Sequence, residues 1–559
     1  MKKQQLRVLA LLLSLSIGLC ACVTAGPAET TTQKPTGTTA GTPPSLETEE
    51  TIVSRICTLP SGKTYLEVDG RPFTMIGAQL RVDGLYNRNP DLTQAPEPVS
   101  DAHLEQYFAA ASRLGVNTLQ LALEWSKIEP EKNVYDFSLV DKLLSLTNQY
   151  GLKCEFLWFS TNMCGDGHGF CIPSYITQDT ETYPVFEGKN LGYSNMYGQI
   201  SYPVLNSPAL MERERLVLTA LMDHVDTWNR ANGGKNPLIG MQIHNESDGL
   251  LRWRLRQREL TLNGEAVTPQ QLWQVTLEAL DNAGKAVKAA DYKIYTRCNM
   301  TVTFGVAEFK EWEGLGLSPL DVLALEGIDI IGDDPYSTSP SAINKTILSY
   351  AVEGNYPHVA ENMGEYASSP SLFLSAYQAG GAYLFYDLAT PEYFVYINGS
   401  SDYQMDQGLL NPDLTQKAHT AATSCIMQGI SQMGSVLPLV EREDFAAFNV
   451  LSEIPQQTLE QTICTSSLSV TYRTEQGGIA FAIEHDGYLY LYATEKCSFT
   501  VDNASFIQRG QIGQFHGEEY QVEDERYLST TISLSAGELM RIRIREVKYD
   551  VTSTTADNV

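Results

Sequence analysis

Residues 238–249 read LIGMQIHNESDG, and this stretch decides the fold. It begins with a mostly apolar run that is typical of a buried strand, and the polar residues His244, Asn245 and Glu246 follow at once. We expect a helix from Ser207-Pro208 through Trp228 before it, and Thr268-Pro269 opens another helix after it. A strand between two helices predicts the repeating unit of a parallel sheet.

The same alternation extends in both directions along the chain. Seven further apolar runs are strand candidates: 73–78, 116–123, 152–159, 293–297, 328–332, 358–360 and 382–385. Eight strands that mostly alternate with helices predict an α/β fold of the (β/α)₈ barrel type. The alternative is an open doubly wound sheet. That architecture would need two lobes or a phosphate-binding turn, and the sequence has neither a GxGxxG nor a Walker motif.

The pattern changes after about residue 430. Short runs rich in β-branched and aromatic residues follow one another, separated by turns such as Asp486-Gly487. The candidate strands are 468–473, 479–484, 488–493, 498–501 and 539–545. This pattern predicts a small all-β domain, and we expect a β-sandwich.

The first residues have the features of an export signal. Lys2 and Lys3 precede a short apolar run, which is followed by Leu19-Cys20-Ala21-Cys22. This sequence resembles a bacterial lipobox with Cys22 as the lipidated residue; the alternative is an ordinary secretory signal. We therefore expect an exported lipoprotein that is anchored to the cell membrane and faces outward.

We expect five segments along the chain. They are a lipoprotein signal peptide at 1–22, a Thr/Pro-rich linker at 23–50, the catalytic barrel at 51–430, the β-sandwich at 431–548 and a disordered tail at 549–559.

Charge and cysteine content restrict the partners. The net charge of −28, from 67 acidic and 39 basic residues, opposes binding to nucleic acid or to anionic lipid. We expect a carbohydrate substrate, and contact with the membrane only through the lipid. Cys164 and Cys171 are the best candidates for a disulfide, and no cysteine spacing fits a zinc site. The adjacent Asp333 and Asp334 are expected to cap a loop, so we predict no metal and no cofactor.

Two glutamates follow strands of the predicted barrel. Glu246 follows the fourth strand and Glu361 the seventh, where barrel enzymes place their catalytic groups. Glycosidic bond cleavage uses two carboxyl groups, one as acid and one as nucleophile or base. Glu365, four residues after Glu361, is a second candidate for the nucleophile.

Two motifs carry a resemblance to a known family. The stretch from Gln242 to Glu246 reads QIHNE, and Trp125, Glu129-Pro130 and Asp136-Phe137 form a W…EP…DF pattern. Both resemble the clan A retaining glycoside hydrolases, in particular the β-galactosidase-like proteins of families 35 and 42. His244 departs from the family pattern, as does Ser247-Asp248-Gly249.

The resemblance implies a role for each matching residue. Glu246 would be the acid/base and Glu361 the nucleophile. Residues expected to bind substrate or support the nucleophile are Asn245, Tyr336, Trp125, Trp158 and Arg81. Asn245 would contact a sugar hydroxyl, Tyr336 would hydrogen-bond Glu361, and the two tryptophans would stack on sugars unless they are core aromatics. Arg81 would keep a carboxylate ionised unless it is an ordinary surface residue.

Three functions fit this sequence. The first is a retaining, exo-acting, β-galactosidase-like hydrolase that cleaves neutral oligo- or polysaccharides outside the cell. The long connection at 160–202 favours it, because such a loop can close one end of a cleft. The second is an endo-acting β-glycanase of the same clan. The third is a catalytically silent surface lipoprotein that binds glycans.

Overall fold

The computed structural model describes residues 50–80, 100–160, 172–187, 203–249, 251, 260–301, 307–364, 366–389, 408–450, 459–502 and 505–545. The structural statements below concern these residues. Several expectations lie outside them: the signal peptide with Cys22, the linker, Arg81, Cys164, Cys171, Glu365 and the tail.

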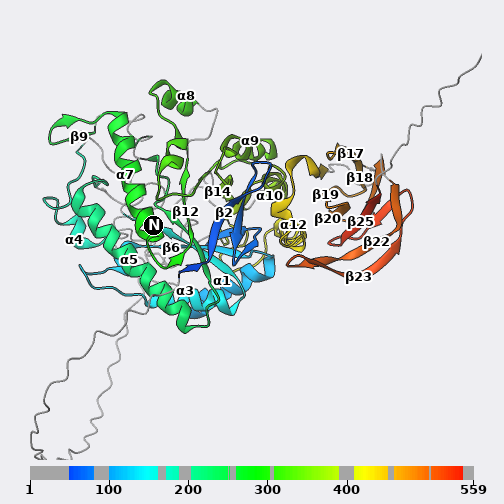
Figure 1. Ribbon diagram of the computed structural model, residues 1–559, viewed down its shortest axis with the longest axis horizontal. Coiled ribbons are helices and arrows are strands. Elements are labelled where there is room, and N and C mark those ends of the chain that lie inside the picture. Colours follow the sequence, from blue (N-terminus) through cyan, green and yellow to red (C-terminus); the bar gives the residue numbers. More distant parts are fainter. Residues whose placement is uncertain are drawn as a thin grey trace, which may run out of the picture. The chain divides into compact units, whose positions relative to one another are not determined.

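Eight parallel strands form a closed barrel (Figure 1). In chain order they are β5 (Ile76–Leu80), β6 (Thr118–Leu123), β7 (Lys153–Trp158), β8 (Leu238–Ile243), β12 (Tyr295–Met300), β13 (Ile330–Asp333), β14 (His358–Met363) and β15 (Ala382–Tyr386). Each strand overlaps one of the eight predicted runs, and β15 pairs with β5 to close the ring. The predicted (β/α)₈ architecture is confirmed.

Helices separate most of the strands and cover the barrel (Figure 1). The longer ones are α1 (Asp101–Leu114), α3 (Ser138–Gln149), α5 (Pro208–Ala231), α7 (Pro269–Lys288), α9 (Pro340–Tyr350), α10 (Ser369–Gln378) and α12 (Thr420–Gln432). The expected helix starts are confirmed: Pro208 is the first residue of α5, and Thr268 caps α7 in a capping box with Gln271. Among the described helices, none is long and apolar enough to cross a membrane.

A small sheet before the barrel lies at the amino-terminal ends of its strands. It consists of β2 (Ser54–Thr58), β3 (Thr64–Val68) and β4 (Arg71–Pro72). The Ser54 hydroxyl donates to the carbonyl of Ile239 in β8 and accepts from the backbone N–H of Tyr295 in β12. This sheet therefore packs against one end of the barrel, opposite the carboxyl ends of the strands. The sequence analysis did not predict it, because its strands are short and carry no regular pattern.

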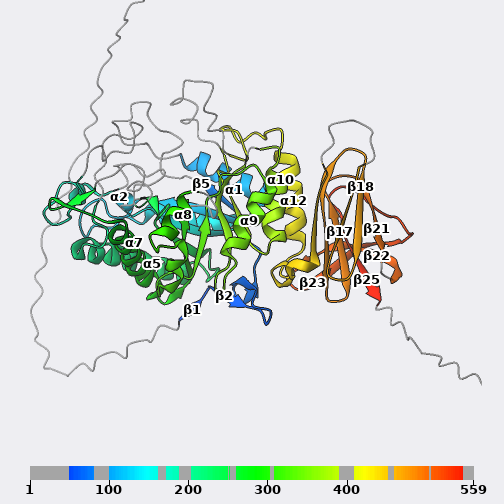
Figure 2. The same ribbon diagram turned by 90° about the horizontal axis from the view of Figure 1, so that it is seen from above.

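The C-terminal domain consists of two antiparallel sheets (Figure 2). The six-stranded sheet has the order β16 (Phe445–Val450), β19 (Gly478–His485), β20 (Tyr488–Ala493), β25 (Leu539–Arg545), β22 (Ser505–His516) and β23 (Glu519–Tyr527). The four-stranded sheet has the order β17 (Leu459–Cys464), β18 (Ser469–Thr474), β21 (Cys497–Asp502) and β24 (Ile532–Leu534). The ring of Phe448 from the first sheet lies 5.7 Å from Tyr472 of the second. Side chains of both sheets share one core, as in the predicted sandwich.

Part of the second face of the six-stranded sheet is also buried. Tyr492 of β20 is fully buried, and its hydroxyl donates to the carbonyl of Cys425 in α12 at 2.6 Å. Gly429 of α12 leaves room for the Tyr492 ring, since a Cβ there would lie 2.4 Å from it. The helix α12 therefore packs against this sheet, and Ser424 of the same helix donates to the carbonyl of Leu114 in α1 of the barrel. The helix ends at Gln432, two residues past the boundary at residue 430 that we expected between barrel and sandwich.

Gly240 in β8 provides a test of how tightly the barrel interior is packed. A Cβ on Gly240 would lie 2.2 Å from the Tyr295 ring. Tyr295 cannot easily move, because its hydroxyl is hydrogen-bonded to the buried Glu155. We expect Gly240→Ala to lower the free energy of unfolding by about 1–3 kcal/mol or more. Denaturant unfolding measures this change.

Gly314→Ala is the matched control for Gly240→Ala. Gly314 is the exposed last residue of helix α8 (Ala307–Gly314), and a Cβ there would meet no atom within 4 Å. We expect this variant to be as stable as the wild type, or slightly more so. Equal stability of Gly240→Ala and Gly314→Ala would contradict the packing described here.

Candidate active site

Glu361 in β14 is held by hydrogen bonds to both of its carboxylate oxygens. The side-chain amide of Gln79 donates to Oε1 at 2.8 Å, and the hydroxyl of Tyr336 donates to Oε2 at 3.0 Å. Only 3% of Glu361 is exposed. Hydrogen bonds of this kind favour the charged form of a carboxylate and fix its orientation. The predicted contact between Tyr336 and Glu361 is present.

Glu246 follows β8 and is half-buried. Its backbone N–H donates to Oδ1 of Asn299 at 2.8 Å. Asn299 also donates to Oδ1 of Asn245 at 3.2 Å, and Gln242 donates to the same oxygen at 3.1 Å. The structure thus brings Asn245 and Glu246 together at the carboxyl end of the strand, as expected.

The backbone is strained where these side chains are presented. His244, Glu246 and Tyr336 have φ angles of 60°, 46° and 40°. Residues other than glycine seldom adopt this left-handed conformation. Such strain persists where the surrounding structure enforces it, and it concentrates at functional sites.

Asp334 connects the two glutamates electrostatically. It is fully buried at the end of β13, and Oδ2 accepts from the side-chain amide of Asn299 at 2.7 Å. Burial raises its pKa well above the usual range, and the nearby charges of Glu361, Glu246 and Asp333 raise it further. Glu246 and Glu361 therefore both lie close to this third carboxyl group.

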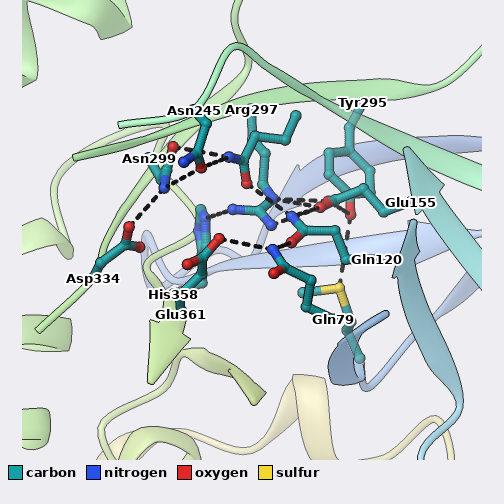
Figure 3. A network of polar contacts seen from close by, with 12 residues as sticks. Gln79, Gln120, Glu155, Asn245, Tyr295, Arg297, Asn299, Asp334, His358 and Glu361 are labelled. Carbon is teal, nitrogen blue, oxygen red and sulfur yellow. Dashed lines mark hydrogen bonds and ion pairs between the residues drawn. The ribbon is translucent and has the colours of Figure 1, made fainter. Parts of the chain in front are cut away.

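An ion pair lies beside these residues, among the strands of the barrel (Figure 3). Glu155 of β7 and Arg297 of β12 are fully buried and approach to 2.6 Å. The hydroxyl of Tyr295 also donates to Glu155 at 2.5 Å. Burial raises the pKa of Glu155, but the charge and hydrogen bonds of Arg297, together with the hydrogen bonds from Tyr295 and Gln120, lower it by more, so the net pKa lies below the ordinary value. Glu155 is thus an ionised acceptor.

His358 lies on the other side of Arg297. Its Nδ1 faces the carbonyl of Tyr356 at 3.2 Å, and its Nε2 faces the Arg297 guanidinium at 3.2 Å. Burial and the positive charge of Arg297 lower the pKa of His358 to about 3. A neutral imidazole with its proton on Nδ1 satisfies both contacts.

The sequence analysis missed several polar residues of this interior. They are Gln79, Gln120, Glu155, Tyr295, Arg297, Asn299 and His358. Each is a polar residue within a strand that is otherwise mostly apolar. A polar residue inside an apolar run is the feature by which the sequence could have indicated them. Their proximity depends on strand register, since Gln79 pairs with Gln120, and Gln120 pairs with Glu155.

Trp125 and Trp158 lie near the carboxyl ends of β6 and β7, but they do not face a surface. Both are fully buried, with ring centroids 5.7 Å apart. The indole N–H of Trp125 donates to Glu129 at 3.0 Å, and that of Trp158 donates to Glu214 at 2.8 Å. In this structure they are core aromatics, which corrects the expectation that they form stacking surfaces for sugars.

His244, which departs from the family pattern, also faces away from the two glutamates. Its Nε2 lies 3.0 Å from Glu214 of α5, the carboxylate that Trp158 contacts. Burial raises the pKa of Glu214, but the charge and hydrogen bond of His244, together with hydrogen bonds from Ser160 and Trp158, lower it by more. His244 therefore ties the end of β8 to α5.

Two expectations about the site stay predictions. Arg81 and Glu365 lie outside the described residues.

No cluster of three or more His, Cys, Asp or Glu side chains in the described part of the chain is arranged to hold a metal ion. Cys154 and Cys298 are buried free thiols.

Asp334 gives the site a measurable pH dependence. Because its folded-state pKa is raised, the folded protein keeps a proton that the unfolded chain releases above about pH 4. Stability therefore falls as the pH rises from that value towards the folded-state pKa. Asp334→Asn removes this loss and keeps an oxygen for Asn299. We expect the Tm difference, variant minus wild type, to increase from about pH 4 to about pH 8.

Asp524→Asn, on the exposed strand β23, is the control for this substitution. Its Tm difference from the wild type should vary little over the same range. A Tm difference for Asp334→Asn that stays constant, or decreases as the pH rises, would contradict the electrostatics described for Asp334.

Two family models match the chain. Residues 93–157 match a family 42 glycoside hydrolase model described as β-galactosidase, and residues 275–455 match a domain of unknown function, DUF4978. No curated protein matches the sequence significantly.

Solved glycosidases resemble the chain in structure. An exo-β-1,4-mannosidase from Opitutaceae bacterium strain TAV5 aligns with a TM-score of 0.45 and 14% identity, over 67% of this chain and 62% of its own. A β-galactosidase from Marinomonas ef1 has a TM-score of 0.44 and 12% identity, over 64% and 60% of the two chains. An endo-1,4-β-mannanase from Rhizomucor miehei has a TM-score of 0.45 and 13% identity, over 67% and 99%.

This chain thus spans about three fifths of the length of the first two structures. The family 42 match includes Trp125, Glu129-Pro130 and Asp136-Phe137. Over residues 93–157 the chain is therefore similar to the family 42 glycoside hydrolases, and the predicted resemblance is confirmed there.

Proposed function

We propose that this protein is a retaining glycoside hydrolase that removes terminal sugars from neutral oligo- or polysaccharides, in the manner of a β-galactosidase. One observation carries the proposal. Glu361 is held through both oxygens by Gln79 and Tyr336, at the end of the barrel where Glu246 also lies. A fixed, ionised carboxylate suits a nucleophile, and a half-buried one at the rim suits an acid/base.

The proposed reaction has two steps. Glu361 attacks the anomeric carbon, the bond to the leaving oxygen breaks, and Glu246 donates a proton to that oxygen. Glu361 is then an ester of the sugar. In the second step Glu246 takes a proton from water, the water oxygen bonds to the anomeric carbon, and Glu361 leaves as a carboxylate. In this proposal Asn245 contacts a sugar hydroxyl, as the family resemblance implies.

We expect Glu246→Gln to reduce kcat/KM for aryl glycosides with poor leaving groups by about 10²–10⁴-fold, since general acid catalysis contributes that much. The loss should be smaller for a dinitrophenyl glycoside, whose leaving group needs no proton. Glu361→Gln should inactivate the enzyme towards both. A panel of aryl β-galactosides, glucosides, mannosides and xylosides measures these effects and identifies the sugar.

Glu265→Gln, on the exposed strand β10 (Glu265–Ala266), is the matched control and should keep wild-type rates. A 2-deoxy-2-fluoro glycoside should label the wild-type enzyme, and peptide fragmentation should place the sugar on Glu361. A label on Glu365 would overturn the assignment of the nucleophile. A wild-type protein that turns over every aryl glycoside only at the background rate, as Glu246→Gln and Glu361→Gln do, would favour a silent glycan-binding protein. Polymer cleavage without release of a monosaccharide would favour an endo-acting enzyme.

The proposed site of action is outside the cell, on a lipid anchor at Cys22. The support is the sequence Leu19-Cys20-Ala21-Cys22 after an apolar run. When the full chain is expressed in a bacterium, labelled palmitate should enter the wild-type protein and the Cys20→Ala variant, but not Cys22→Ala. Incorporation into Cys22→Ala would exclude Cys22 as the anchor.

A further inference from the structure

A chain of side-chain amides connects the buried ion pair to the candidate nucleophile (Figure 3). The amide nitrogen of Gln120 lies 2.9 Å from Glu155 Oε1, and its oxygen lies 2.7 Å from the amide nitrogen of Gln79. That nitrogen of Gln79 lies 2.8 Å from Glu361 Oε1. All four residues are almost fully buried, so water cannot substitute for these hydrogen bonds.

The carboxylates at the two ends of this hydrogen-bonded series determine which way each amide points. An ionised carboxylate only accepts hydrogen bonds, so Gln120 must present its NH₂ group to Glu155. Its oxygen then faces Gln79, and Gln79 must present its NH₂ group to both Gln120 and Glu361. A reversed Gln120 would place its carbonyl oxygen against the Glu155 carboxylate. The buried charge of Glu155, held by Arg297, thus opposes reversal.

A second series of hydrogen bonds leads from Gln120 to Glu246, and it requires the same orientation of the Gln120 amide. Gln120 also donates to the oxygen of Gln242 at 2.8 Å, and Gln242 donates to Asn299 Oδ1 at 2.8 Å. The same Asn299 oxygen accepts the backbone N–H of Glu246. A backbone N–H can only donate, so the orientation of Asn299 is fixed independently. Both ends of the network therefore require the same orientation of Gln120.

The reaction changes what Glu361 offers to Gln79. In the glycosyl-enzyme Glu361 is a neutral ester, which is a weaker acceptor than a carboxylate. Glu361 alone would then hold Gln79 less firmly. The oxygen of Gln120 still faces the Gln79 NH₂ group, because Glu155 is unaffected by the reaction. In the second step negative charge returns to Glu361, and a donor already in place stabilises that charge.

We propose that Gln120, oriented by the buried Glu155 carboxylate, is a positioning residue that keeps Gln79 as a hydrogen-bond donor to Glu361 throughout the reaction. This inference rests on the proposed function, and its kinetic consequence is specific. We call the hydrogen-bonded series Glu155–Gln120–Gln79–Glu361 the relay. Loss of the relay should slow release of the sugar from Glu361 more than its transfer to Glu361.

Gln120→Met tests the relay, since it removes the amide, approximates its volume and leaves the pair of Glu155 and Arg297 intact. With a dinitrophenyl glycoside we expect kcat to fall on the order of 10-fold, because one correctly placed donor to developing charge contributes at least that much. KM should fall with kcat, because the glycosyl-enzyme accumulates, so kcat/KM should stay within about threefold of wild type. Rapid mixing should show a burst of dinitrophenolate equal to the active enzyme.

A loss of kcat/KM as large as the loss of kcat, without a burst, would show only a structural role and would overturn the relay. Glu155→Gln is the second variant, and it should change kcat, KM and the burst in the same direction. Glu129→Gln is its matched control: Glu129 is a buried carboxylate that also contacts an arginine, Arg213, at 2.7 Å and a tyrosine hydroxyl, that of Tyr175, at 2.5 Å. This control should show no burst.

Neutron diffraction from deuterium-exchanged wild-type crystals tests the relay independently of activity. The ND₂ group of Gln120 should face Glu155, and that of Gln79 should face Glu361. The opposite orientation of either amide would overturn the relay. A wild-type enzyme that hydrolyses no glycoside would instead overturn the proposed function, and the neutron map would still decide the orientation of the amides.

Discussion

The ion pair of Glu155 and Arg297 is the constraint on which the interior of this barrel depends. Both side chains are completely buried. Removing charges from water costs several kcal/mol per ion, and their attraction offsets this cost only when the remaining hydrogen bonds are made. Glu155 accepts hydrogen bonds from the hydroxyl of Tyr295 and the amide of Gln120 as well as from Arg297. Once these donors are in place, the side-chain amides of Gln120 and Gln79 have a single favourable orientation.

An interior with this many buried polar side chains differs from the usual interior of a (β/α)₈ barrel. Branched apolar side chains generally fill the layers between the strands of a (β/α)₈ barrel. Here the strands carry amides and charges up to Glu361 and Asp334 (Figure 3). Directional hydrogen bonds hold the carboxylates more precisely than apolar packing does, because each bond restricts an angle as well as a distance. The hydrogen bonds of this cluster also limit how far the strand ends can move.

The sequence was sufficient for the barrel and for four of the site residues. Apolar runs with helix starts at Pro208 and Thr268 indicated the element order, and Glu246 and Glu361 were expected from their positions after strands. Asn245 and Tyr336 were expected only from the family resemblance. Gln79, Gln120 and Glu155 did not follow. Strands of a parallel barrel are buried on both faces, so no alternation tells which polar residue points inward. Only the pairing register brings these three together. For Trp125, position was predictable but orientation was not.

Glu129 has a consequence for how relatives of this protein are recognised. It accepts hydrogen bonds from Trp125 and Tyr175 and pairs with Arg213 of α5, so it braces segments that surround the barrel. Trp125 and Glu129 both lie in the segment that matches family 42. The segment that matches family 42 therefore contains two of these bracing residues and neither Glu246 nor Glu361. Replacing Glu246 or Glu361 would leave that segment unchanged, whereas replacing Glu129 would alter both the segment and the contacts to Tyr175 and Arg213.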